Sequence, residues 1–181
     1  MRLTGIIVLS LMVISAFSQS QSERKRARDY GLKIGVLPPG KLNAITDVSG
    51  VKVGHVTIVE GQNIRTGVTA IVPHEGNIFQ SKVPAGIYVE NGFGKLAGIT
   101  QVYELGNIET PIVLTNTLSV AVGISGVIEY TLSLAGNENV QSVNAVVGET
   151  NDGYLNDIRG QHVKKEHVVS AIRSAQSGSV A

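Results

Sequence analysis

Alternating and continuous apolar stretches predict the strands of this protein. Residues 51–60 (VKVGHVTIVE) alternate apolar and polar side chains for most of their length, which predicts a half-buried strand. Four shorter apolar runs bounded by Gly, Pro or Asn predict further strands, at 67–72, 86–89, 111–114 and 143–147.

Two longer segments predict helices. Residues 118–134 are mainly apolar and small, and they carry Gly123 and Gly126, each of which costs about 1 kcal/mol inside a helix. We therefore expect this helix to pack closely against another element. Residues 164–175 place Val168, Ala171, Ile172 and Ala175 on one helical face. Strands followed by helix, strand and helix predict an α+β or layered α/β fold.

The first 18 residues read as a targeting segment. Arg2 precedes the apolar run 6–14, and small residues then stand three and one positions before a possible cut after Ser18, which is the layout of a signal peptide. The run is too short to span a membrane, which needs roughly 20 residues; the alternative is a buried N-terminal helix. We expect an exported protein, periplasmic or secreted, without stable membrane insertion. Residues 19–35 then form an N-terminal arm and 36–181 a single domain.

Composition excludes several classes of function. Lys and Arg total 15 against 14 Asp and Glu, a balance that argues against a nucleic-acid binder. With no Cys there is no disulfide, thiolate metal site or Cys nucleophile, and the four His lack metal-ligand spacing. The glycine spacing of residues 91–98 is one residue too long for a dinucleotide fingerprint. We expect no metal and no cofactor.

Polar residues after two predicted strands are the candidates for chemistry. Residues 149–157 (ETNDGYLND) form either an Asx-rich turn or a site loop whose amides stabilise an oxyanion. Thr115, Asn116 and Thr117 end a strand, where Asn116 or Thr117 could simply cap the next helix. Glu104 could bind a substrate ammonium group or lie on the surface.

Several segments together resemble one known family. They are 26–32 (RARDYGL), 42–55 (LNAITDVSGVKVGH), 65–69 (RTGVT), 91–94 (NGFG), 111–117 (PIVLTNT) and 155–158 (LNDI). From about Arg26 to Ala181 the chain resembles the DmpA-type family of L-aminopeptidase/D-esterases and β-peptidyl aminopeptidases. The run from Asn43 to His55 is the most specific part of this resemblance.

The resemblance implies a fold and a chemistry. The fold would be an α-β-β-α sandwich, and the precursor would cut itself before a Ser that becomes the N-terminal nucleophile of a second chain. Such enzymes release N-terminal residues from peptides, amides or esters, need no metal, and usually form homo-oligomers. We expect this chain to be most of the first subunit, incomplete at the C-terminus, inactive alone, and without the nucleophile.

Few site residues carry over from the family. Asn156 matches the expected oxyanion-hole donor, and Glu104 is a candidate for holding the substrate's ammonium group. Asn91 and Asn116 fit structural or supporting roles better than catalytic ones. Lys95 stands where relatives often carry Glu. The alternative function is a non-catalytic exported module for binding or assembly on the same scaffold.

Overall fold

The computed structural model describes residues 25–180, so the predicted signal peptide lies outside the described residues. The chain divides into two units, residues 1–38 and 39–181. The described part of the first unit holds one 3₁₀ turn, Ala27–Tyr30. The backbone N–H of Arg26 donates to Asp29 Oδ2 at 2.9 Å, and Gly31 ends the turn at φ 81°.

A five-stranded sheet organises the second unit. Its order is β1 (Lys52–Glu60), β2 (Ile64–Val72), β6 (Ile112–Asn116), β7 (Val146–Thr150) and β4 (Leu96–Ala97). Strands β1 and β2 form a long antiparallel hairpin, and β6 and β7 are the parallel pair. Strand β3 (Val83–Pro84) pairs with β5 (Asn107–Ile108) in a separate small sheet.

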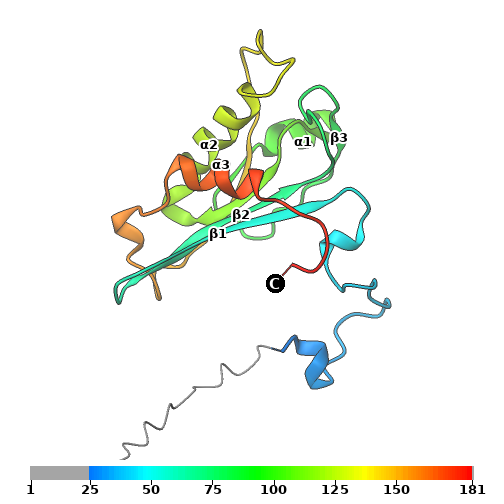
Figure 1. The fold of residues 1–181 in the computed structure, drawn as a ribbon, viewed down its shortest axis with the longest axis vertical. Helices are drawn as coiled ribbons and strands as arrows, with labels where there is room; N and C mark the ends of the chain where they lie inside the picture. Colours follow the sequence, from blue (N-terminus) through cyan, green and yellow to red (C-terminus); the bar gives the residue numbers. More distant parts are fainter. Residues whose placement is uncertain (1–24, 181) are drawn as a thin grey trace, which may run out of the picture. The chain divides into compact units, whose positions relative to one another are not determined.

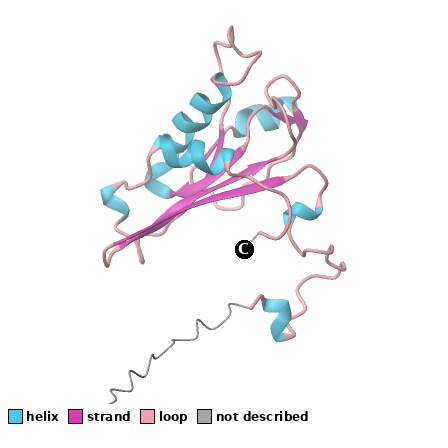
Figure 2. Ribbon diagram, viewed as in Figure 1, coloured by secondary structure: helices cyan, strands magenta, loops and turns pink. Residues whose placement is uncertain are grey.

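Two helices cover one face of the large sheet (Figure 1; Figure 2). They are α2 (Val120–Leu132) and α3 (Lys165–Arg173), while α1 (Ile99–Leu105) leads into β5. Short 3₁₀ turns occupy Ile45–Asp47, Thr117–Ser119 and Ile158–Gly160. Both predicted helices and most predicted strands are confirmed. The strand predicted at 86–89 is wrong: pairing ends at Ala85, whose N–H donates to the carbonyl of Gly106, and Tyr88 is exposed.

Aliphatic side chains fill the space between the sheet and the helices. Val113 and Val147 from the sheet meet Val127 and Val168 from the helices, all fully buried. The glycines of α2 allow this approach. A Cβ on Gly126 would lie 2.6 Å from Val168 Cβ, and one on Gly123 would lie 2.7 Å from Val147 Cγ1. The close packing expected from these two glycines is therefore confirmed.

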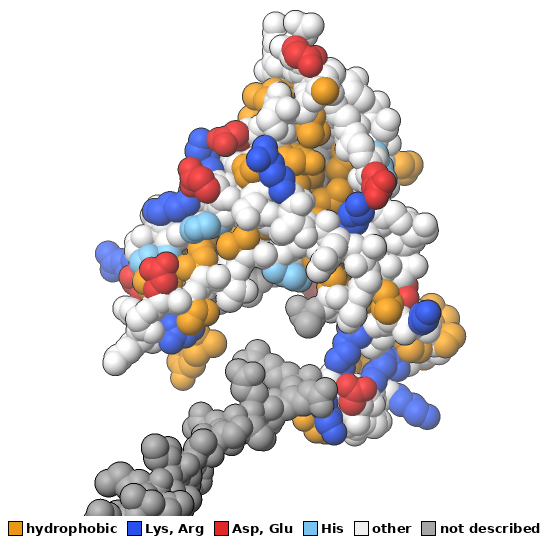
Figure 3. All heavy atoms as spheres, in the orientation of Figure 1, with side chains coloured by type: hydrophobic (Ala, Val, Ile, Leu, Met, Phe, Trp, Pro, Cys, Tyr) orange, Lys and Arg blue, Asp and Glu red, His pale blue; other side chains and the backbone are white. Residues whose placement is uncertain are grey.

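The chain after α3 returns to the edge of the sheet. Val53 and Gln176 exchange two backbone hydrogen bonds of 3.0 Å, which extends the sheet beyond β1 for one bridge. The Thr46 hydroxyl donates to the carbonyl oxygen of Gly178 at 2.5 Å. These contacts cover the edge of β1 near its start. In Figure 3, acidic and basic side chains are interspersed over the helices instead of gathering by sign.

His74 closes the loop after β2 in a way that should make stability depend on pH. Its Nδ1 lies 2.6 Å from the carbonyl oxygen of Glu75, and its Nε2 lies 2.8 Å from that of Ser81. Only the imidazolium form can donate to both carbonyls. The bond to Glu75, and then that to Ser81, raises the pKa of His74 above its usual 6.5.

The raised pKa fixes the sign of the effect. Stabilisation by His74 is complete below pH 6.5 and is lost as the pH rises through the raised pKa. We expect the free energy of unfolding, measured by urea titration at a series of pH values from below 6.5 upward, to fall more with rising pH in the wild type than in His74→Gln. Parallel profiles for the two proteins would show that His74 does not hold the loop by its charge.

Candidate functional site

Two pockets meet where the parallel strands β6 and β7 end. Asn116 and Thr150 are partners in the register of these strands, so the residues that follow each strand lie side by side. Thr150 lines both pockets. Carboxyl ends of neighbouring parallel strands are a common place for ligand sites in α/β proteins. The sheet thus brings the two polar segments of the sequence together.

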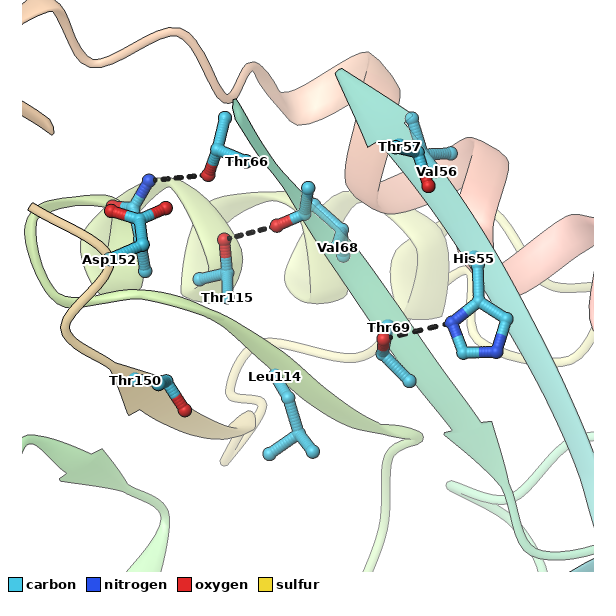
Figure 4. A pocket seen from close by; sticks show the side chains of 12 residues that line it. His55, Val56, Thr57, Thr66, Val68, Thr69, Leu114, Thr115, Thr150 and Asp152 are labelled. Atoms are coloured by element: carbon cyan, nitrogen blue, oxygen red, sulfur yellow. Dashed lines mark hydrogen bonds between the residues drawn. The ribbon is translucent and has the colours of Figure 1, made fainter. Parts of the chain in front are cut away.

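The first pocket, of about 360 Å³, lies over β1, β2 and β6 (Figure 4). His55 and Thr69 point toward each other from neighbouring strands, with Nδ1 and Oγ1 2.9 Å apart. Thr150 and Asp152 approach from the end of β7. Asn116 also lines this pocket; its Nδ2 donates to Thr66 Oγ1 at 2.9 Å, while its buried Oδ1 has no hydrogen-bond partner.

The second pocket, of about 260 Å³, lies between the glycine-rich turn and the end of β7. Its lining residues are Asn91, Phe93, Gly94, Lys95, Thr117, Glu149, Thr150 and Asn151. Asn91 shapes the turn, because its Oδ1 accepts the N–H of Phe93 at 3.0 Å. That contact is structural, and the role expected of Asn91 stays a prediction. The turn supplies one wall and brings Lys95 against Glu149.

Glu149 is the unusual group of the second pocket. Its side chain is only 8% exposed. Oε1 accepts the backbone N–H of Lys95 at 2.8 Å and lies 3.9 Å from Lys95 Nζ. Oε2 is buried without any hydrogen-bond partner, and so is the hydroxyl of Thr117 in the same pocket.

Such a half-partnered carboxylate has a chemical consequence. A buried carboxylate oxygen without a donor costs free energy, which a hydrogen-bonding cation can recover. An ammonium group has three donors and one positive charge, so it could bond both Glu149 Oε2 and Thr117 Oγ1. The second pocket is therefore suited to a primary ammonium group.

Sequence reasoning did not select Glu149. It placed this residue in the polar segment after a strand but chose Glu104 for the ammonium group. Glu104 is exposed on α1 and lines neither pocket. The sequence did contain a signal: Glu149 follows an apolar strand, and a charged side chain at the end of a buried strand needs a partner. The role of Glu104 stays a prediction that no described contact supports.

Asn156 lies beside the first pocket and does not line it. Its Oδ1 accepts the N–H of Arg65 at 3.1 Å, and its Nδ2 donates to Asp152 Oδ1 at 3.1 Å. The side chain is thus bonded at both ends and ties the loop after β7 to the β1–β2 hairpin. These contacts give Asn156 a positioning role, and its role as oxyanion donor stays a prediction.

Replacing Asn156 by Ala should therefore lower stability. The change removes two hydrogen bonds and leaves the Arg65 N–H without its acceptor, which costs about 1–3 kcal/mol. Urea unfolding of Asn156→Ala measures the loss, and Asn151→Ala, in the same exposed loop, is the control. A purely catalytic oxyanion donor would leave the unfolding free energy unchanged.

Metal and membrane features are simple to report for residues 25–180. No group of three or more His, Asp or Glu side chains in this range is placed to hold a metal ion. No helix in the same range is long and apolar enough to cross a membrane.

Comparison with solved structures defines the class of fold. The structure is similar to the L-aminopeptidase D-Ala-esterase/amidase of Ochrobactrum anthropi, described as a variant of the Ntn hydrolase fold, with TM-score 0.77, 35% identity, and 87% of this chain and 46% of that chain covered. It is also similar to the PH0078 protein of Pyrococcus horikoshii OT3, with TM-score 0.79, 54% identity, and 84% and 46% covered. The expected fold class is confirmed; the described residues provide a large sheet with helices on one face.

Sequence comparison defines the family. The profile of Peptidase family S58 matches residues 43–181, and the chain belongs to this family. It is 38% identical over 183 residues to the β-peptidyl aminopeptidase BapA of Sphingosinicella microcystinivorans. That alignment covers 97% of this chain and 44% of the relative, so the chain spans less than half the length of the curated relative.

Proposed function

We propose that this chain is the amine-recognising first part of an exported serine aminopeptidase. The observation that carries the proposal is Oε2 of Glu149, a buried oxygen without a hydrogen-bond partner on a residue that lines a pocket. An aminopeptidase must recognise the free amine of its substrate, and a buried carboxylate does so by charge and hydrogen bonds. Membership of Peptidase family S58 and the names of the relatives support the same activity.

The proposed reaction is acyl transfer to a serine. A Ser at the start of a second chain, formed by self-cleavage outside these residues, attacks the carbonyl carbon of the bound N-terminal residue with its hydroxyl oxygen and gives up the hydroxyl proton. The amine or alcohol leaves with a proton, and water then hydrolyses the acyl-enzyme ester to regenerate the Ser hydroxyl. Glu149 and Thr117 hold the substrate's ammonium group throughout. Substrates are peptides, amides or esters with a free N-terminal amine.

Further parts of the proposal concern assembly and location. The curated relative is more than twice as long as this chain, which supports a missing second subunit that carries the nucleophile. We propose that the complete enzyme forms homo-oligomers, and that residues 1–18 direct export to the periplasm or outside the cell. It uses no cofactor and does not bind nucleic acid.

Titration with paired ligands tests the amine site. Alaninamide carries a free ammonium group, and N-acetylalaninamide has the same skeleton without the charge. We expect alaninamide to shift the backbone amide signals of Gly94 and Lys95 in an NMR titration of the ¹⁵N-labelled chain, and the acetylated ligand to leave them unchanged. Equal shifts with both ligands would show that the pocket does not recognise an amine.

A further inference from the structure

A lysine shares the carboxylate that is proposed to hold the substrate. Lys95 Nζ lies 3.9 Å from Glu149 Oε1, donates to the carbonyl oxygen of Phe93 at 3.4 Å, and stands 5.0 Å from the centre of the Phe93 ring. These contacts keep the Lys95 ammonium group at the rim of the pocket, where its side chain is 51% exposed. The other oxygen of Glu149, Oε2, is buried and has no hydrogen-bond partner.

A second set of lysine, phenylalanine and glutamate contacts, which lines neither pocket, serves as a comparison. Lys82 stands 4.3 Å from the ring centre of Phe79, donates to its carbonyl oxygen at 2.9 Å, and pairs with Glu109 Oε2 at 3.0 Å. The other oxygen of Glu109 accepts the backbone N–H of Asn144 at 2.8 Å. Both oxygens of Glu109 are therefore occupied, whereas Glu149, which lines the second pocket, has one buried oxygen without a hydrogen-bond partner.

The positive charge of Lys95 beside Glu149 affects which amines the second pocket binds. A ligand ammonium group on Oε2 would place two cations on one carboxylate, and their repulsion weakens binding of a simple amine. A ligand that carries its own carboxylate beside the amine removes this penalty, because that carboxylate can pair with Lys95. Specificity then comes from repulsion of one ligand as much as from attraction of the other.

We infer that Lys95 makes the pocket selective for N-terminal residues with a carboxylate close to the amine, as in an aspartyl residue. This inference rests on the proposed amine site and adds the class of substrate. Lys95 is a specificity-determining residue in this account: it contacts the substrate's acidic group, while Glu149 holds the ammonium group. The expected preference is about twofold to fivefold, the size of a half-exposed ion pair.

The test compares two amines on the full chain by NMR titration. Alaninamide and the α-amide of aspartic acid share the ammonium and amide groups and differ in the side-chain carboxylate. We expect the aspartic acid amide to have a dissociation constant about twofold to fivefold lower. Lys95→Met should abolish or reverse this ratio, and Lys95→Arg should keep it. Lys165→Met, whose lysine pairs with Glu129 at 2.6 Å and lines neither pocket, should also keep it.

The outcomes distinguish a failure of the selectivity attributed to Lys95 from a failure of the proposed amine site. Equal dissociation constants in the wild type, or an unchanged ratio in Lys95→Met, overturn the selectivity while the amine site stands. If neither amine binds, both the amine site and the selectivity are overturned.

Discussion

Replacing Glu149 by Gln is expected to lower the affinity for alaninamide by about 10- to 100-fold. Hydrogen bonds to a charged group are worth about 1.5–3 kcal/mol, and the change removes the charge while it keeps the shape. Gln can still accept the N–H of Lys95, which Glu149 Oε1 accepts at 2.8 Å, so the turn should stay in place. The dissociation constant from an NMR titration measures the effect.

Glu104→Gln is the matched control for this experiment. It is the same chemical change at the acid that the sequence alone suggested, on the exposed face of α1. We expect its dissociation constant to equal that of the wild type. A loss of affinity in Glu104→Gln with none in Glu149→Gln would assign the ammonium group to Glu104 and remove the basis for the second pocket.

Replacing Gly54 by Ala is expected to cost about 2–4 kcal/mol of stability. Gly54 lies on β1 under α3, and a Cβ there would overlap the carbonyl oxygen of Ala171 and lie 2.8 Å from the Ala175 nitrogen. Both are backbone atoms, so the end of α3 would have to move as a unit. Overpacking of a well-packed interior usually costs 1–3 kcal/mol, and a backbone clash lies at or above the upper end.

Gly86→Ala controls for the general effect of removing a glycine. Gly86 has open space around it and no positive φ, so the variant changes the unfolded chain in the same way without a clash. We expect its unfolding free energy to stay within about 0.5 kcal/mol of the wild type. Urea unfolding of both variants measures the difference. Equal stability of Gly54→Ala and Gly86→Ala would mean that α3 does not rest on β1 as described.

Local patterns predicted the elements of this fold well. The alternation in residues 51–60 became β1, and the apolar stripe of 164–175 became α3. The two glycines of 118–134 predicted close packing, and α2 does pack closely on Val147 and Val168. The short run 86–89 misled because an apolar segment of four residues forms a strand only where a partner strand is available.

The site was harder to predict than the fold because it depends on pairing between distant strands. Glu149 and Thr117 come together only because β6 and β7 are parallel neighbours, and sequence spacing carries no record of that register. The wall that Lys95 and Phe93 provide comes from a turn more than 50 residues before Glu149. Asn156 was predicted as an oxyanion donor, and its bonds to Arg65 and Asp152 could not be read from the sequence.

Intact-mass and N-terminal analysis of the protein from its native source tests the central claim most directly. The account predicts two chains: one that starts near Gln19 and contains these residues, and a second that begins with Ser and carries the nucleophile. A single species that ends at Ala181, with no second chain, would contradict the account. In that case the serine aminopeptidase would give way to a non-catalytic binding module on the same scaffold.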